Sequence, residues 1–365
     1  MRAVGPLRVF TISRAAVWVL AGATVLLFES RLNPARGRWD SDRLHELGPL
    51  LDVWARWDSE WYLRIAEDGY SWPSSTPAFP PLYPLVVGGL GRVLADRYLL
   101  AGVLVSLAAA AVAFALLHRL ARDRVGEATA QRAVLYLALF PTTLFLGAVY
   151  AESLLLALAL GAFLCAERGR LGWAGVLAGL AALTRVQGLA LVPALVLFAW
   201  RDPNRGRALL SGAVVPVALF SLFPIVLAVQ LGRPLAFLEA QRDVWERELS
   251  PLGPLGGLAQ AVADRELAEL AFASLMLPLA VLAWRRLGAA YGLYAGLVLA
   301  LPMSVPSERL GGLYSFPRLA LAAFPCFLML AILGGNRRVH VAVAAVLTTC
   351  LVVFVVRWSL WYWVA

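Results

Sequence analysis

The sequence has no lysine and little charge of any kind. Asp, Glu, Lys and Arg together make up 15% of the 365 residues, whereas hydrophobic residues make up 61%. An ordinary soluble domain has about 25% charged residues, so this composition excludes both intrinsic disorder and a single water-soluble core. All 32 basic residues are arginine, a choice that by itself indicates no function.

Cysteine is also scarce. Cys165, Cys326 and Cys350 all lie in apolar segments, where a thiol serves as a small packing group. We therefore expect no disulfide and no metal cluster. The apolar segments show no alternation with a period of two residues, which excludes a closed membrane β-barrel.

Long apolar runs are abundant. A helix of about 20 apolar residues crosses a bilayer, so these runs predict an all-α polytopic membrane protein. We expect about eleven transmembrane helices and treat residues 1–365 as a single membrane domain. An uncleaved first span is favoured over a signal peptide, because no small-residue cleavage site follows Phe28. The expected spans are residues 9–28, 98–117, 133–150, 152–167, 171–184, 187–200, 208–231, 268–284, 288–303, 318–334 and 339–356.

The placement of arginine predicts the orientation. Alternate connections are short and rich in arginine, which puts them and the N-terminus in the cytoplasm. Two long connections, residues 29–97 and 232–267, then face outward. Residues 80–94 are apolar, but a span there would invert everything after it, so we expect an interfacial or re-entrant helix. The expected location is the plasma membrane, with the active site on the extracytoplasmic side.

Residues 56–70 in the first outer loop carry the most information. Trp57, Trp61 and Ile65 recur every four residues and predict an apolar stripe on a short amphipathic helix at the membrane surface. Gly69 suits the end of that helix. On another line of the same helix, Glu60, Arg64 and Asp68 are spaced to form two ion pairs.

Asp58 stands at the start of this helix. Its simplest role is an N-cap that accepts a hydrogen bond from a backbone N–H near Trp61. Its functional role would be a general base that takes a proton from a substrate hydroxyl. Both roles stay open, since a carboxylate has two oxygens. Asp58 and Glu60 also form an acid-x-acid pair that suits a divalent cation, although two carboxylates alone are a weak signal.

Polar residues also mark the outer ends of later spans. Glu152 follows Tyr150 between two apolar runs, where an acid is a functional candidate and a solvent-exposed hairpin is the alternative. Arg185, followed by Gln187, lies between two short spans, and Arg318 starts another. Two arginines at an outer interface suit a phosphate-bearing lipid, but they suit ordinary headgroups and snorkelling equally well.

The second outer loop predicts another surface helix. Pro234 suits its first turn, and Leu238, Trp245 and Leu249 lie near one face. The glycine- and proline-rich residues 251–257 predict a loop, with a lid as the alternative.

Four ordered motifs together resemble the PIG-V type mannosyltransferases of the GT-C glycosyltransferase superfamily. They cover about the first half of the chain. Where the family usually has two aromatic residues in the second motif, this chain has Phe79 followed by Pro80. The motifs are Trp57-Asp58-Ser59-Glu60-Trp61-Tyr62 with Ile65-Ala66 and Gly69-Tyr70; Ala78-Phe79-Pro80-Pro81-Leu82-Tyr83-Pro84; Phe140-Pro141 with Tyr150-Ala151-Glu152-Ser153; and Arg185 with Gly188.

This resemblance implies the function and the site. It implies a GT-C fold in a bacterial member, and transfer of a sugar, usually mannose, from a polyprenyl-phosphate donor with inversion at the anomeric carbon. Asp58 would be the catalytic base. The expected partners are that donor, a lipid, glycan or protein acceptor, and membrane lipids, with no nucleic acid. No cofactor or metal is firmly implied beyond the optional cation at Asp58 and Glu60. The residues expected to bind substrate are Glu60, Tyr62, Tyr83, Tyr150, Glu152, Arg185, Gln187, Gln241 and Arg318.

Two other functions fit parts of the sequence. A transporter or flippase of a lipid-linked substrate would place charged groups near the bilayer midplane in broken helices. Most charges here lie at span ends, with Arg14 the main exception. A non-catalytic protein that binds lipid-linked sugars would keep the surface helices and arginines but tolerate loss of Asp58.

Overall fold

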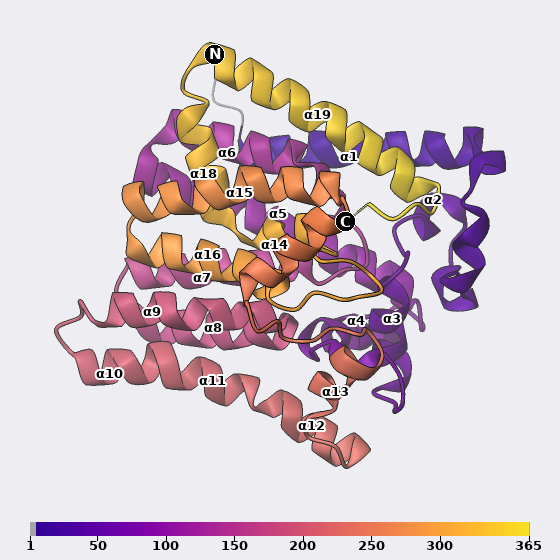
Figure 1. Ribbon diagram of the computed structural model, residues 1–365, viewed down its shortest axis with the longest axis horizontal. Helices are drawn as coiled ribbons and strands as arrows, with labels where there is room; N and C mark the ends of the chain where they lie inside the picture. The colour runs from indigo at the N-terminus through magenta and orange to yellow at the C-terminus, as the bar shows by residue number, and fades with distance from the viewer. Residues whose placement is uncertain (1–4, 365) are drawn as a thin grey trace. The chain divides into compact units, whose positions relative to one another are not determined.

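The computed structural model describes residues 5–364, and these residues are predominantly helical (Figure 1). Apart from isolated bridges between Arg247, Ser307 and Gly311, they form no strand, which confirms the expected all-α class. The α-helices are α1 (Pro6–Leu27), α2 (Pro49–Asp52), α3 (Ser59–Asp68), α4 (Leu82–Val93), α5 (Tyr98–Val125), α6 (Glu127–Leu139), α7 (Glu152–Glu167), α8 (Leu171–Thr184), α9 (Leu191–Ala199), α10 (Arg205–Leu209), α11 (Val215–Phe220), α12 (Leu222–Leu231), α13 (Ala236–Asp243), α14 (Pro254–Ala263), α15 (Leu267–Arg286), α16 (Ala289–Met303), α17 (Phe316–Leu319), α18 (Phe324–Leu333) and α19 (Arg337–Ser359).

Among residues 5–364, five helices are long and apolar enough to cross a bilayer. They are α1, α5, the continuous helix Arg205–Leu231, α15 and α19, and each matches a predicted span. Phe316–Ala322 and Phe324–Leu333 give a sixth if this pair, bent by 85°, crosses as one span. Helices α4, α8 and α16 are apolar but shorter, as is the segment Val186–Ala199. The predicted count of eleven spans is therefore not confirmed.

The helix expected over residues 133–150 ends early. α6 stops at Leu139 and a 3-10 helix, η5 (Pro141–Leu146), follows it. Pro141 has no backbone N–H to donate, and it favours an extended conformation at Phe140, which has φ −61° and ψ 136°. The proline that interrupts this apolar run thus ends the helix.

Arg14, the charged residue inside the first span, hydrogen-bonds to the irregular backbone that follows α6. Its guanidinium donates hydrogen bonds to the backbone oxygen of Thr143 at 2.7 Å and to the Thr143 hydroxyl at 3.1 Å. Irregular backbone in an apolar environment must find hydrogen-bond partners within the protein. Arg14 therefore has a structural use, because it satisfies a carbonyl that no α-helix takes up.

The helices fall into two compact units, described separately here. The first unit holds residues up to 69, residues 83–157 and residues 330–364. Within it α1 lies beside α19, and α5 lies beside α6 (Figure 1). The second unit holds residues 70–82 and 158–329; within it α8 lies beside α9 and α11, and α15 beside α16.

Buried aromatic residues form much of each core. In the first unit the rings of Tyr150 and Trp358 both contact Phe145, with centroids 4.9 and 5.1 Å away. In the second unit Phe163 contacts Tyr294 at 5.3 Å and Phe324 at 5.0 Å. Edge-to-face and tilted pairs of this kind add about 0.5–1.5 kcal/mol each to the stability that buried aliphatic residues supply.

Candidate active site

Helix α3 carries the first sequence motif. It begins at Ser59 and ends at Asp68, and the C-cap residue Gly69, with a positive φ of 83° and an N–H bond to the Ile65 oxygen, confirms the predicted helix end. Asp58 occupies the N-cap position, but its side chain makes no capping hydrogen bond. The N-cap role for this carboxylate is therefore wrong, and Asp58, which is only 8% exposed, needs another explanation.

A tyrosine hydroxyl holds the backbone around Asp58. The Asp58 N–H donates to the Tyr150 hydroxyl at 3.1 Å, and that hydroxyl donates to the backbone oxygen of Arg56 at 3.0 Å. Trp57, the residue between them, has φ 56°, a left-handed conformation that costs a bulky residue about 1–3 kcal/mol. One hydroxyl thus braces a strained turn from both sides.

The three tyrosines predicted to bind substrate meet beside this turn. The Tyr62 ring lies 5.0 Å from the Tyr83 ring and 6.0 Å from the Tyr150 ring, measured between centroids. The Tyr83 hydroxyl donates to the Gly102 oxygen at 3.1 Å and lies 2.8 Å from the Ser106 hydroxyl. All three tyrosines are buried, and the structure places them in one group with Asp58.

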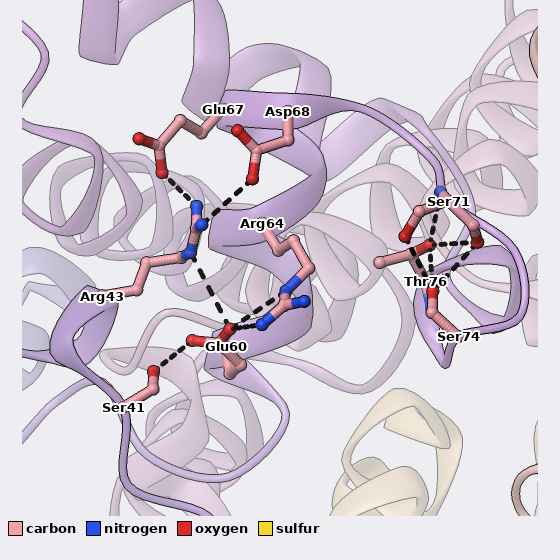
Figure 2. Close-up of polar contacts among 9 residues, drawn as sticks. All are labelled: Ser41, Arg43, Glu60, Arg64, Glu67, Asp68, Ser71, Ser74 and Thr76. Atoms are coloured by element: carbon pink, nitrogen blue, oxygen red, sulfur yellow. Dashed lines mark hydrogen bonds and ion pairs between the residues drawn. The ribbon is translucent and has the colours of Figure 1, made fainter.

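Glu60 is engaged by neighbouring side chains. The Ser41 hydroxyl donates to its Oε2 at 2.5 Å, and the Arg64 guanidinium donates to its Oε1 at 2.6 Å (Figure 2). Arg43 approaches Oε1 to 3.8 Å. The predicted pair of Glu60 and Arg64 is confirmed, and Glu60 fastens α3 to the segment that precedes it.

The second predicted ion pair, between Arg64 and Asp68, does not form, and Asp68 pairs with Arg43 instead. The Arg43 guanidinium contacts Glu67 and lies 3.0 Å from an oxygen of Asp68 (Figure 2). Asp68 thus pairs with a residue 25 positions away rather than with its neighbour one turn back on the helix. Figure 2 also shows the hydroxyl groups that close the turn following the helix, those of Ser71, Ser74 and Thr76.

The predicted apolar stripe of α3 is partly wrong. Trp57 precedes the first turn, and Trp61 is half-buried. The buried face of the helix is formed by Tyr62, Leu63 and Ile65 with their neighbours. Because Tyr62 and Leu63 are packed inside the protein, contacts within its own unit hold the helix in place.

Glu152 begins α7 and is 3% exposed. It lies two residues after Tyr150, in the first turn of the helix, where the helix dipole favours a negative charge. The alternative of a solvent-exposed hairpin is therefore wrong for this acid, because its surroundings are buried.

The remaining predicted site residues belong to the second unit. Arg185 ends α8 in an extended conformation and is half-buried. Gln187 follows in a 3-10 helix, η6 (Val186–Ala190), and donates to the Val298 oxygen at 3.3 Å. Arg318 on α17 is 3% exposed, with one guanidinium nitrogen 3.3 Å from the Ser315 hydroxyl. Gln241 is half-buried on α13.

The predicted second surface helix is shorter than expected. α13 begins after Pro234 and ends before Trp245 and Leu249, so these residues do not share a helix face. Trp245 is buried in the following loop, whereas Leu249 is exposed. Part of the glycine- and proline-rich stretch forms the start of α14, because Pro254 suits the first turn of a helix.

Two residues beside Asp58 and the three tyrosines, Arg56 and Ser106, are not among the site residues predicted from the sequence. Arg56 donates to the backbone of Ser359, and Ser106 donates to the Tyr150 oxygen at 3.2 Å. Burial lowers the pKa of Arg56, an effect that Asp40 opposes, and the guanidinium stays charged at neutral pH. Ser106 lies within an apolar run, where a lone serine carries no distinguishing pattern.

Comparison with known proteins bears on the same residues. Residues 39–200 match the family model "Mannosyltransferase (PIG-V)". GPI alpha-1,6-mannosyltransferase 2 of Rattus norvegicus is 38% identical over 156 residues, which are 39% of this chain and 31% of that protein. The Mus musculus protein of the same name is 37% identical over 153 residues, 38% of this chain and 30% of its own length. The chain thus spans about a third of the length of these relatives.

The fold is also similar to that of a solved structure. The crystal structure of ArnT from Cupriavidus metallidurans bound to undecaprenyl phosphate has a TM-score of 0.50 and 18% identity, with 88% of this chain and 59% of that chain covered. This similarity supports the GT-C fold that the motifs imply. The predicted resemblance to the PIG-V type mannosyltransferases is confirmed over residues 39–200, the part of the chain that carries Asp58 and all four motifs.

Proposed function

We propose that this chain is a membrane glycosyltransferase that transfers a sugar, mannose in the first instance, from a polyprenyl-phosphate donor to an extracytoplasmic acceptor with inversion. Asp58 is the proposed general base. The observation that carries the proposal is the placement of Asp58: a buried carboxylate at the start of α3, inside the region matched by the mannosyltransferase family and not used as a helix cap. The relatives named as mannosyltransferases and the undecaprenyl phosphate bound to ArnT support the sugar and the donor.

The proposed reaction is a single displacement. Asp58 takes the proton of the acceptor hydroxyl as its oxygen forms a bond to the anomeric carbon. The bond from that carbon to the donor phosphate breaks, and the phosphate leaves with the electron pair through an oxocarbenium-like transition state. A phosphate leaves as a stable anion, so no second catalytic carboxylate is needed. Arg185 and Arg318 are proposed to bind the phosphate, because guanidinium groups match its geometry.

Other residues are proposed to hold the sugar and acceptor. The carboxylate of Glu152 and the amides of Gln187 and Gln241 suit sugar hydroxyls. Tyr62, Tyr83 and Tyr150 supply the aromatic surface beside Asp58. Glu60 is tied to Ser41 and Arg64, so its main part is to hold α3 in place.

The proposed location is the plasma membrane, with the N-terminus in the cytoplasm and the site outside. That the chain is a bacterial member of the family also stays a prediction. Nucleotide sugars are not normally present outside the cytoplasm, and this favours a lipid-carried donor for a site on that side. The positive charge of the short connections supports the orientation.

Transfer of labelled mannose from polyprenyl-phosphate-mannose to native-membrane acceptors tests the proposal. We expect transfer by the parent protein and a loss of at least about a hundredfold in Asp58→Asn, because the base is removed while its shape is kept. Asp264→Asn is the matched control: this exposed aspartate lies at the end of α14 in the other unit and should leave transfer unchanged.

Three results would contradict parts of the proposal. Equal transfer by the parent and Asp58→Asn would remove Asp58 as base. Absence of transfer with mannose and with other polyprenyl-phosphate sugars would favour a transporter or a binding protein. A chelator in the same assay tests the cation proposed for Asp58 and Glu60; we expect unchanged transfer, because Glu60 is already engaged by Ser41 and Arg64.

A further inference from the structure

We propose that residues 358–363, called here the C-terminal segment, position the strained turn that carries Asp58, with Trp361 as the central positioning residue. This inference rests on the proposed function of Asp58. It brings in a part of the chain that lies outside the residues matched by the family model.

Hydrogen bonds join the segment to the first outer loop. The Trp358 indole N–H donates to the Val53 oxygen at 2.8 Å, and the Arg56 guanidinium donates to the Ser359 oxygen at 3.2 Å. The partners of these bonds are 305 and 303 residues apart in sequence. Both bonds are buried, where a lost partner is costly. The backbone on the N-terminal side of Asp58 is therefore fastened to the end of α19.

The segment is fastened a second time by Asn33. The Asn33 side-chain amide donates to the Trp361 oxygen at 3.1 Å, and its backbone N–H donates to the Leu360 oxygen at 2.9 Å. Asn33 lies at the start of the same outer loop. The segment is thus held along its length rather than at one point.

Tryptophan rings fill the space between the segment and the turn. The Arg56 guanidinium lies 4.2 Å above the Trp361 ring, a cation–π contact. The Trp57 ring lies 5.9 Å from that of Trp361, 5.4 Å from Trp363 and 5.6 Å from Trp39. Trp361 is 3% exposed and Trp57 is 9% exposed, whereas Trp39 and Trp363 are partly exposed. The two central rings therefore pack inside the protein and do not form an open sugar-binding surface.

The backbone shows what this cluster does. Trp57 has φ 56° and Trp361 has φ 64°, so the two residues that face each other both adopt the left-handed conformation. Bulky side chains hold that conformation only where their surroundings impose it. Trp57 directly precedes Asp58. If Trp361 no longer holds Trp57 in place, Trp57 can relax to an ordinary conformation and change the direction of the Asp58 backbone N–H and carboxylate.

This arrangement separates positioning from binding. Trp361 contacts Arg56 and Trp57, and neither of these residues is among those proposed to bind the donor. Loss of the Trp361 ring should therefore slow the chemical step and leave donor affinity nearly unchanged.

The experiment compares Trp361→Ala, the conservative variant Trp361→Phe and the control Trp284→Ala. Trp284 is a half-exposed tryptophan on α15, in the other unit. In the mannose-transfer assay we expect kcat to fall about tenfold to a hundredfold in Trp361→Ala, with KM within about twofold. Trp361→Phe should recover most of the loss, because it keeps a ring beneath Arg56, and the control should match the parent.

Hydrogen exchange of the same detergent-solubilised proteins gives a readout that needs no substrate. In Trp361→Ala we expect faster exchange at residues 53–60 and unchanged exchange in α15 and α16. If the parent transfers no sugar, the proposed function fails, and the exchange result alone decides whether the segment holds the turn. Parental kcat in Trp361→Ala, parental exchange at residues 53–60, or faster exchange throughout the chain would each overturn the proposal.

Discussion

At the scale of single residues, the Tyr150 hydroxyl does the most for the candidate site. It accepts from the Asp58 N–H and donates to the Arg56 oxygen, so both polar groups are satisfied without water. Tyr150→Phe should lower the free energy of unfolding by about 1–3 kcal/mol, because two buried groups lose their partner. The same change should slow transfer, since Asp58 is no longer held.

The measurement is the thermal unfolding midpoint in detergent together with the transfer rate. Tyr98→Phe is the matched control, because the Tyr98 hydroxyl donates to Asp96 at an exposed position, where water can replace a lost partner. An unchanged midpoint and rate in Tyr150→Phe would show that the hydroxyl is not what braces the turn.

Local patterns predict part of this site. The helix end at Gly69 and the pair of Glu60 and Arg64 follow from spacing within one helix, and both are confirmed. The partner of the Asp58 N–H is 92 residues away, and no local pattern signals it. Trp57 fits a helical stripe by spacing, but its left-handed backbone removes it from the helix. Tertiary contacts, rather than local helix propensity, determine the partner of the Asp58 N–H and the backbone conformation of Trp57.

At the scale of elements, Gly188 sets how closely η6 approaches α8. A Cβ atom added there would lie 2.3 Å from the backbone carbon of Ala181, which is far inside contact distance. Gly188→Ala should therefore force the two elements apart and lower the free energy of unfolding by about 1–3 kcal/mol. Arg185 and Gln187 lie on the displaced segment, so we expect transfer to fall as well.

Gly172→Ala is the control for this change. A Cβ atom at Gly172, on α8, would meet nothing within 4 Å, and alanine favours a helix, so stability should stay equal or rise slightly. Thermal unfolding of both variants decides the matter: equal midpoints would mean that the close approach at Gly188 relaxes without cost.

The sequence predicts long elements better than short ones. Hydropathy alone identifies α1, α5, α15 and α19, because each contains a long, mostly apolar run. The break after α6 is signalled by Phe140 and Pro141. Two other features are only weakly indicated by the sequence. They are the 85° bend between residues 322 and 324 and the start of α14 inside the glycine- and proline-rich stretch. Short helices depend on packing for their stability, so local composition indicates them poorly.

At the scale of the whole molecule, the distribution of arginine predicts which loops face outward. Gly37 and Gly206 lie at exposed positions in a predicted outer and a predicted inner connection, and a Cβ atom at either would meet nothing within 4 Å. A membrane-impermeant maleimide should label Gly37→Cys in intact cells and Gly206→Cys only after lysis, because basic loops stay in the cytoplasm. The reverse pattern would invert the topology.

This labelling requires a background without the native cysteines, which lie in apolar helices. The predicted orientation rests on composition, because insertion depends on the charge of each connection. The packing of residues 5–69, 83–157 and 330–364 into one compact unit has no such signal in the sequence, since it joins segments that are far apart in the chain.

The contact between residues 358–363 and the first outer loop also orders events during synthesis. Arg56 leaves the ribosome 303 residues before Ser359, so the loop is synthesised long before its anchor exists. Closing a contact over that distance comes late in folding. A chain interrupted before residue 358 would carry every candidate site residue and still lack the geometry around Asp58. We therefore expect the proposed site to form only once α19 is complete, and chains that stop before residue 358 to be inactive.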